Sequence, residues 1–336
     1  MKTDPPPHPT PPLARLTHQL AAAYLLANLG SKAKGLPEMP PVSHLSKRVV
    51  RVMGLNPGPF TLQGSCTYVV GRGPKRILID TGDGNAAYLS LLLQVLKDEG
   101  ATVSQVVITH DHYDHVGGIP SLRAALPGVK VWKHTRSSLE RDPGGAPFDG
   151  ELANGTMVSE QDCTLRAVLT PGHCADHVAL VLEEEGAVFS GDCVLGSGTA
   201  VFDDLHAYVG SLRILLAELQ ALARCADATK REHPARIYPG HGLVVDDGVA
   251  KVEQYLAHRQ LREDQIMALL ERAKAALSTE VIVDHIYKDQ GLSWAVRRGA
   301  MRSVAQHLAK LLKEGRVFEV DRAWAAISAK QQQHKD

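Results

Sequence analysis

The residues ITHDHYDHVGGI (108–119) place three histidines and two aspartates within six positions. The five side chains are those of His110, Asp111, His112, Asp114 and His115. Crowded carboxylates repel one another and each imidazole needs a partner, so the cluster is costly unless a cation neutralises it. Neutral imidazole and carboxylate are common zinc ligands. The stretch therefore predicts a metal site, against the alternative of a histidine-rich polar loop.

The short spacing of these ligands indicates two ions rather than one. His110 and His112 can share one ion while Asp114 and His115 serve a neighbouring ion, because four ligands so close in sequence cannot surround one ion in good geometry. Each ion then needs further ligands, and three more residues follow apolar runs with a glycine directly before them. These residues are His173, Asp192 and His241. The repeated pattern predicts a dinuclear site.

The segments around the cluster alternate between short β-rich runs and helices, which is typical of a layered α/β domain. Strands are expected at 48–54, 66–71, 76–80, 104–109, 129–134, 163–170, 177–185, 187–192 and 235–240. Helices are expected at 86–100 and 206–226. We assign these elements to one domain over residues 45–250.

Beyond residue 249 the strand pattern nearly vanishes. Helical patterns cover 249–277, 278–289 and 292–315, and a short strand follows at 316–320. Three helices followed by a strand is the order of a winged helix, although a small helical bundle has the same order. We therefore expect a winged-helix-like helical domain over residues 251–336.

Composition limits the classes of protein to which the chain can belong. The 336 residues suggest two domains, and 44% hydrophobic with 22% charged residues indicates a globular chain. From residue 251 onward, 15 Lys and Arg face 11 Asp and Glu, a net charge of +4 within a neutral chain. The five cysteines show no C-x-x-C spacing, which favours a reducing compartment over a disulfide framework. An apolar run long enough to span a membrane is absent from the sequence.

The N-terminal extension, residues 1–44, begins with a proline-rich stretch over 1–12 and continues with a helical pattern over 13–35. Up to Glu38 its only acidic residue is Asp4. Few acids together with an amphipathic helix fit an organelle transit peptide. The single arginine and few serines favour the alternative of a helix that packs on the main domain. The expected location is the mitochondrial matrix or the cytoplasm, and secretion is not expected.

Five short motifs resemble those of the metallo-β-lactamase superfamily. They are LIDTG with Asp80, THDHYDH with His110, His112, Asp114 and His115, TPGH with His173, SGD with Asp192, and PGHG with His241. The resemblance implies that His110, His112 and His173 bind one zinc ion and that Asp114, His115 and His241 bind the other. It also implies that Asp192 bridges the two ions and that Asp80 orients the metal-binding loop.

Longer segments resemble the β-lactamase-like protein 2 family of mitochondrial endoribonucleases. The similar segments are residues 49–82, 190–205 and 238–266, and the likeness extends over about residues 45 to 325. It implies an αββα sandwich with the metals between the two sheet edges and single-stranded RNA as the substrate. The chain departs from the family at Asp111, where Trp is common, at Cys66, where Asn is usual, and at 223–235, which resembles an insertion. These departures leave the seven metal ligands in place.

The candidate catalytic residues are Asp114, His177 and Asp80. Two zinc ions roughly 3.5–4 Å apart can lower the pKa of a shared water and stabilise charge that develops on a substrate. The departing group needs a proton donor, and His177 is the candidate because it lies four residues past His173. The alternative role for His177 is that of a hydrogen-bond partner to the metal site.

Three functions remain open from the sequence. The first is a dinuclear-zinc endoribonuclease that cleaves single-stranded RNA, favoured by cations in the last domain. These cations are Arg297, Arg298, Arg302, Lys310 and Lys313. The second is a thioesterase that acts on an acyl carrier protein or resembles glyoxalase II, because fungal polyketide thioesterases share the stretch FTLQG. The third is a non-catalytic module with structural metals. A homo-oligomer is compatible with each, and a membrane partner is not expected.

Overall fold

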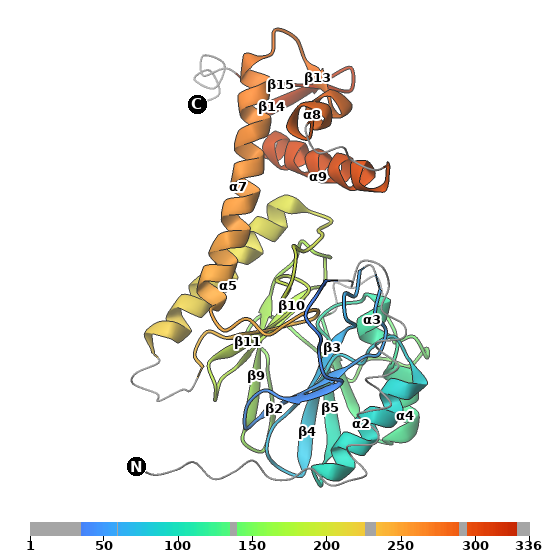
Figure 1. Ribbon diagram of the computed structural model, residues 1–336. Coiled ribbons are helices and arrows are strands. Elements are labelled where there is room, and N and C mark those ends of the chain that lie inside the picture. Colours follow the sequence, from blue (N-terminus) through green and yellow to red (C-terminus); the bar gives the residue numbers. More distant parts are fainter. Residues whose placement is uncertain (1–34, 59, 135–139, 226–232, 289–293, 328–336) are drawn as a thin grey trace.

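The computed structural model describes residues 35–58, 60–134, 140–225, 233–288 and 294–327 (Figure 1). The helix expected over 13–35 lies almost wholly outside these residues, as does most of the suggested insertion at 223–235. Within the described ranges, a helix that combines the length and the apolarity needed to cross a bilayer is absent.

The N-terminal half of the chain forms a seven-stranded sheet in the order β1-β2-β3-β4-β5-β6-β7. The strands are β1 (Val42–His44), β2 (Val49–Met53), β3 (Cys66–Val70), β4 (Lys75–Ile79), β5 (Thr102–Val107), β6 (Lys130–Lys133) and β7 (Gly150–Glu151). From β1 to β4 neighbouring strands are antiparallel, and from β4 to β7 they are parallel. The carboxyl ends of β4 and β5 therefore meet at one edge, where Asp80 and His110 follow.

Three helices accompany this sheet. They are α2 (Ala86–Asp98), α3 (Tyr113–Val116) and α4 (Ile119–Ala125). Asn85 caps the N-terminus of α2, where its side chain accepts a hydrogen bond from the Ala87 amide. The helix buries an apolar stripe that includes Leu91, Leu92 and Val95. Figure 1 shows α2 and α4 on the outer face of the sheet.

A second sheet of five strands is ordered β12-β11-β10-β9-β8. Its strands are β8 (Met157–Glu160), β9 (Cys163–Leu169), β10 (Val178–Leu182), β11 (Ala187–Gly191) and β12 (Ile237–Pro239). Helices α5 (Leu205–Arg224) and α7 (Gly248–Arg272) cover its outer face, where Val188, Leu212 and Tyr255 join one apolar cluster. The inner faces of both sheets pack together, with the Tyr68 and Phe189 rings 5.1 Å apart. These four layers confirm the predicted αββα sandwich.

The C-terminal part is a small helical unit with a three-stranded sheet ordered β13-β15-β14. It contains β13 (Leu277–Ser278), α8 (Thr279–Ile286), α9 (Trp294–Lys313), β14 (Val317–Val320) and β15 (Ala323–Ala326). Its core also takes in Ile266, Met267 and Leu270 from the end of α7, so α7 contributes to both cores. The predicted winged-helix arrangement is confirmed, with a second wing strand, β15, that the sequence pattern did not indicate. The boundaries proposed for the domains stay predictions.

Candidate metal centre

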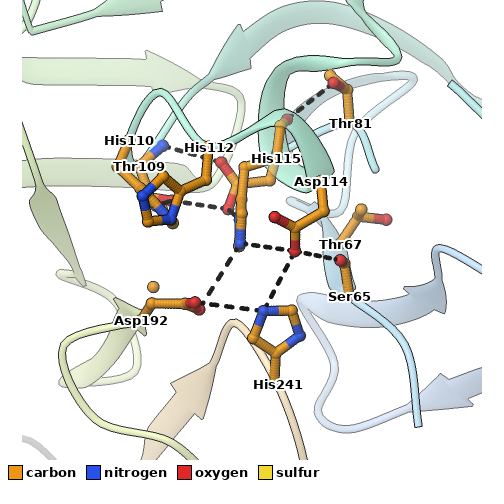
Figure 2. A network of polar contacts seen from close by, with 12 residues as sticks. Ser65, Thr67, Thr81, Thr109, His110, His112, Asp114, His115, Asp192 and His241 are labelled. Atoms are coloured by element: carbon orange, nitrogen blue, oxygen red, sulfur yellow. Dashed lines mark hydrogen bonds and ion pairs between the residues drawn. The ribbon is translucent and has the colours of Figure 1, made fainter. Parts of the chain in front are cut away.

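Seven side chains gather where the two sheets meet, and their ligand-type atoms form two groups. One group is His110, His112, His173 and Asp192, and the other is Asp114, His115 and His241. Within each group the nitrogen and oxygen atoms lie within 4.8 Å of one another. Figure 2 shows Asp114, His115, Asp192 and His241 turned toward one shared space. The structure therefore brings together all seven residues that the sequence singled out.

Strand ends position these side chains. His110 follows β5, the single turn of α3 carries Asp114 and His115, and His173 lies in the loop after β9. Asp192 and His241 follow β11 and β12, which are parallel, so their carboxyl ends are neighbours. An antiparallel bridge between Ser65 and His241 joins the first sheet to the second at this edge.

Close approach explains the glycines that precede the ligands. A Cβ atom on Gly240 would lie 2.3 Å from Oδ1 of Asp192. Gly191 has φ +47°, and a Cβ there would lie 2.6 Å from Nε2 of His177. A larger residue at either position would displace the side chains of the centre, so these two positions accommodate only glycine.

Hydrogen bonds on the outer side of the histidines fix their tautomers. Nδ1 of His115 is 2.8 Å from Oδ2 of Asp80, and Nδ1 of His173 is 2.8 Å from the Val201 carbonyl oxygen. Both oxygens only accept hydrogen bonds, so each Nδ1 carries the proton and each Nε2 keeps its lone pair toward the centre. His112 presents Nδ1 instead, 3.1 Å from Nε2 of His110 and of His173. Lone pairs that converge in this way suit a cation.

Unpartnered atoms and shifted pKa values also favour a cation. Nε2 of His115 and Oδ1 of Asp192 are buried without a hydrogen-bond partner, although the two atoms lie only 3.6 Å apart. Burial lowers the pKa of His241, but the Asp192 and Asp114 carboxylates outweigh it and raise that pKa to about 10. The pKa values of both carboxyl groups are held below their usual range despite burial, by His115 and His241. The carboxylates thus stabilise positive charge, and the residues present fit metal ions.

Comparison with known proteins identifies the family. Residues 60–241 match the model of the Metallo-beta-lactamase superfamily, and residues 278–324 match the Beta-lactamase associated winged helix domain. The chain belongs to the metallo-beta-lactamase superfamily. As a member of this superfamily it is a metal-dependent hydrolase, and its candidate metal site is the pair of groups described above.

Individual proteins that resemble this chain agree with its assignment to the superfamily. It is 41% identical over 281 residues to a Beta-lactamase-like protein 2 homolog of Caenorhabditis elegans, covering 83% of this chain and 89% of the relative. It is 36% identical over 301 residues to an Atrochrysone carboxyl ACP thioesterase of Passalora fulva, covering 87% of this chain and 84% of the relative. A beta-lactamase domain protein from Burkholderia ambifaria has the same fold, with a TM-score of 0.68 at 19% identity over 89% and 99% of the two chains.

Asp80 supports both groups of this metallo-beta-lactamase site. Its Oδ1 accepts from the Thr109 amide at 2.8 Å, and its Oδ2 accepts from the Thr109 hydroxyl at 2.8 Å and from His115. Because the Thr109 hydroxyl donates to Asp80, it can accept the Nδ1 proton of His110, 3.0 Å away. Asp80 itself has φ +58°, a conformation that aspartate tolerates. This arrangement agrees with the predicted orienting role of Asp80.

His177 is held inside the protein beside the metal centre. It is fully buried; its Nε2 accepts from the Asp192 amide at 3.0 Å and its Nδ1 lies 2.7 Å from the Thr170 hydroxyl. Burial and the neighbouring histidines hold the pKa of His177 well below its usual value, so the ring is neutral. Both ring nitrogens are therefore engaged inside the protein, which favours the alternative prediction, a positioning role on the backbone of Asp192. The proton-donor role of His177 stays a prediction.

Two supporting residues were not found from the sequence. The Ser65 hydroxyl donates to Oδ2 of Asp114 at 2.8 Å, and Asn56 contacts Ser65 through both its amide atoms. The neighbouring Cys66 is buried, with Sγ near the Gly242 carbonyl oxygen. Support for Asp114 thus comes from Ser65, one residue before the position at which the family usually has Asn. A lone serine beside an unusual cysteine gave no signal in the sequence.

Asp111, the predicted acidic residue at the rim, lies with Cys174 and Asp176 in a third group of ligand-type atoms. Asp176 forms an ion pair with Lys133, and both side chains are buried. Burial raises the pKa of the Cys174 thiol far above its usual value, with Asp176 next in effect. The lysine already neutralises Asp176 and the thiol is not ionised, so this group has less need of a cation than the other two.

The two ligand groups open into a cavity of about 380 Å³. Residues of the segment from Leu195 to Val201 form one wall, and Phe60 lies at the mouth with 79% of its surface exposed. Among its lining residues, all of them in the described part of the chain, there is neither a lysine nor an arginine.

The cations expected to bind RNA mostly have partners inside the protein. Arg297 pairs with Asp284, and Arg302 lies 2.6 Å from Asp203. The remaining pairs join Lys310 to Glu263 and Glu314, and Lys313 to Asp204. Helix α9 therefore uses much of its positive charge to hold neighbouring segments, including the residues that follow the cavity wall.

Proposed function

We propose that the chain is a dinuclear-zinc endoribonuclease that hydrolyses phosphodiester bonds of single-stranded RNA. The observation that carries the proposal is the pair of ligand groups that share one open cavity. The assignment to RNA is supported by the likeness to a Beta-lactamase-like protein 2 homolog over 83% of the chain, and by the match of residues 278–324 to the winged helix domain. We include location in the mitochondrial matrix or cytoplasm, and a homo-oligomer, as parts of this proposal.

Each site residue has a task in this reaction. Two bound zinc ions would supply positive charge that lowers the pKa of a water and stabilises the phosphodiester as it gains charge. His110, His112 and His173 would hold one ion, and Asp114, His115 and His241 the other. Asp192 is within 3.3 Å of His241 and 3.8 Å of His173, so its carboxylate is within reach of both groups. Ser65 and Asp80 keep the ligands oriented through hydrogen bonds.

The mouth of the cavity suits an unpaired base. Phe60 exposes an aromatic ring beside the ligand groups, and aromatic rings stack on any nucleobase. Stacking of one base contributes about 1–3 kcal/mol, so Phe60→Ala should raise KM for RNA by about fivefold or more. Phe318→Ala, which removes a part-exposed ring from β14, is the matched control and should leave KM unchanged.

A thioesterase is the second candidate. The cavity lining combines apolar residues with the ligand groups and offers no lysine or arginine to a polyanion, as stated above. Such a wall suits an uncharged acyl chain, and thioesterases are among the relatives of the chain. The same metal chemistry serves either ester.

One experiment separates the two candidates. Protein expressed with zinc is incubated with labelled single-stranded RNA and, separately, with an acyl thioester, each with and without EDTA. The Asp192→Ala variant serves as the inactive control. RNA cleavage that EDTA and the variant both abolish supports the proposal. Thioester hydrolysis without RNA cleavage would replace it by the second candidate, and turnover that resists EDTA would refute both.

A further inference from the structure

A second cavity lies away from the metal centre, between the sandwich and the winged-helix part. It has a volume of about 230 Å³ and is lined by residues of α5, α7 and α9. In Figure 1 these are the helices that meet where α7 leaves the sandwich. The side chains that matter here are Arg213 of α5, Arg259 and Glu263 of α7, and His307 and Lys310 of α9.

His307 is the unusual residue of this cavity. It is 1% exposed, and neither Nδ1 nor Nε2 has a hydrogen-bond partner. A neutral imidazole carries one donor and one acceptor, and burying both without partners is costly. Nε of Arg259, in the same lining, is also buried without a partner. Unsatisfied donors that are buried on two facing helices indicate a missing acceptor.

The charges around the cavity favour a negative ligand. Glu263 contributes the only carboxylate of the lining, all of which lies in the described residues, and Lys310 and Arg316 both pair with it. The positive charges of Arg259 and Arg213 are not neutralised by a carboxylate of the lining in this way. Arg213 is exposed at the edge of the cavity and has no ion-pair partner in the part of the chain that the structure describes. The lining therefore has excess positive charge.

The cavity also adjoins the wall of the metal centre. Arg259 donates to the Ala200 carbonyl oxygen at 3.1 Å, and its guanidinium lies 4.8 Å from the Phe202 ring centre. Ala200 lines the metal-site cavity, and the next residue, Val201, accepts from His173. Arg259 thus lines the second cavity and contacts a residue that lines the first.

We infer that the cavity between α5, α7 and α9 binds a small oxyanion, such as phosphate or a carboxylate, through Arg213, Arg259 and His307. The oxyanion accepts hydrogen bonds from the buried donors and neutralises the excess positive charge. Because Arg259 contacts the cavity wall, a bound oxyanion steadies the segment that holds His173. The site is separate from the proposed hydrolytic reaction and does not depend on the nature of its substrate.

Binding is measured on the full-length protein by thermal shift and isothermal titration calorimetry. The probes are inorganic phosphate and acetate, each compared with chloride at equal ionic strength, so that a tetrahedral oxyanion is distinguished from a carboxylate. Arg213→Met removes one exposed charge, and Arg224→Met is the matched control, an exposed arginine on the same helix. His307→Leu removes both buried nitrogens, and Asp192→Ala disables the metal centre.

We expect at least one oxyanion to raise Tm saturably in the wild type. Loss of one charge-assisted hydrogen bond in Arg213→Met should weaken Kd by about tenfold, and His307→Leu should remove the effect. Arg224→Met and Asp192→Ala should bind as the wild type does. An absent response, an equal weakening in both arginine variants, or loss of the response in Asp192→Ala would overturn the inference. The exposed Arg213 keeps the test decisive even where His307→Leu folds poorly.

Discussion

Asp80 shows how much of the centre depends on a residue outside both ligand groups. Its carboxylate accepts three hydrogen bonds, two from Thr109 and one from His115. In Asp80→Asn, one of the two oxygens becomes an NH2 group that faces another donor. We expect kcat to fall about 10–100-fold, the usual cost of losing such outer support, with zinc binding weakened in parallel. Asp83 is a nearby aspartate whose Oδ1 accepts a hydrogen bond from the Asn85 amide, and Asp83→Asn should retain near-normal activity.

Asp192 is predicted to be indispensable. Its carboxylate lies within ion-pair distance of His115, His173 and His241, while its backbone amide is held separately by His177. Asp192→Ala should therefore abolish turnover and leave the far-ultraviolet circular dichroism spectrum unchanged. Asp98→Ala, on an exposed part of α2, is the control. Activity above a few per cent of the wild type would contradict a bridging role.

His177 offers a sharper test, because its two predicted roles differ in their pH dependence. A positioning role predicts that His177→Ala lowers kcat by about tenfold to a hundredfold, while the shape of the pH–rate profile is kept. His177→Gln keeps an acceptor for the Asp192 amide and should recover part of the loss. If the decline in rate at alkaline pH disappeared from the pH–rate profiles of both variants, His177 would instead be the proton donor.

At the scale of elements, the strands that deliver ligands were predictable because they are buried apolar runs. The pattern at 104–109 corresponds to β5, and the pattern at 187–192 to β11. Short edge strands such as β8 were missed, since Met157 is exposed and the segment depends on pairing with β9. The predicted strand at 76–80 stops one residue early because Asp80 leaves the extended conformation.

The wing illustrates a signal that the sequence lacks. Strands β14 and β15 are joined at Asp321 and Arg322, with φ of 49° and 63°. Two-residue turns of this kind usually contain Asn-Gly or Asp-Gly, and neither residue here is a glycine. The helix expected to run to residue 277 ends at Arg272, because Leu277 and Ser278 pair with β15. Both differences arise from tertiary pairing that local patterns do not encode.

The junction of α5, α7 and α9 predicts a pH dependence of stability. Burial, then the nearby cations, lowers the pKa of His307 to about 3 in the folded protein. The charged or titratable groups that face it are Arg213 of α5, His258, Arg259, Arg262 and Glu263 of α7, and Lys310 of α9. The unfolded chain, with a pKa near 6.5, binds the proton more readily. Stability is therefore fully present above pH 6.5 and is lost as the pH falls from there toward 3.

Urea unfolding at several pH values in phosphate-free and acetate-free buffer measures this effect. The wild type should lose stability relative to His307→Leu by up to about 1.4 kcal/mol per pH unit below pH 6.5. The comparison cancels the titration of the metal centre, which both proteins share. Parallel pH dependence in the two proteins would show that His307 titrates normally.

For the whole molecule, metal content is the quantity that underlies the proposed function. We expect elemental analysis to find about two zinc ions per chain after zinc-supplemented expression. Removal of zinc leaves the carboxylates and imidazoles of two groups without their counter-charge, so Tm should fall and activity should be lost. Adding zinc back should restore both. A zinc content near zero with unchanged activity would exclude the dinuclear site.

Helix α7 belongs to both cores: Val252 and Tyr255 pack in the sandwich, and Ile266 and Met267 pack in the winged-helix part. Each residue of a helix adds about 1.5 Å along the axis and about 100° of rotation about it. The number of residues between the two cores therefore sets the rotation of the winged-helix part about the α7 axis, relative to the sandwich. Inserting one alanine near position 261 should rotate the winged-helix part about the axis of α7 and separate Arg302 from Asp203. Inserting seven residues restores this rotation to within about 20° but lengthens α7 by about two turns. The chain thus encodes the mutual orientation of its two halves as a count of residues, and limited proteolysis of the two insertion variants would show whether angle or distance matters more.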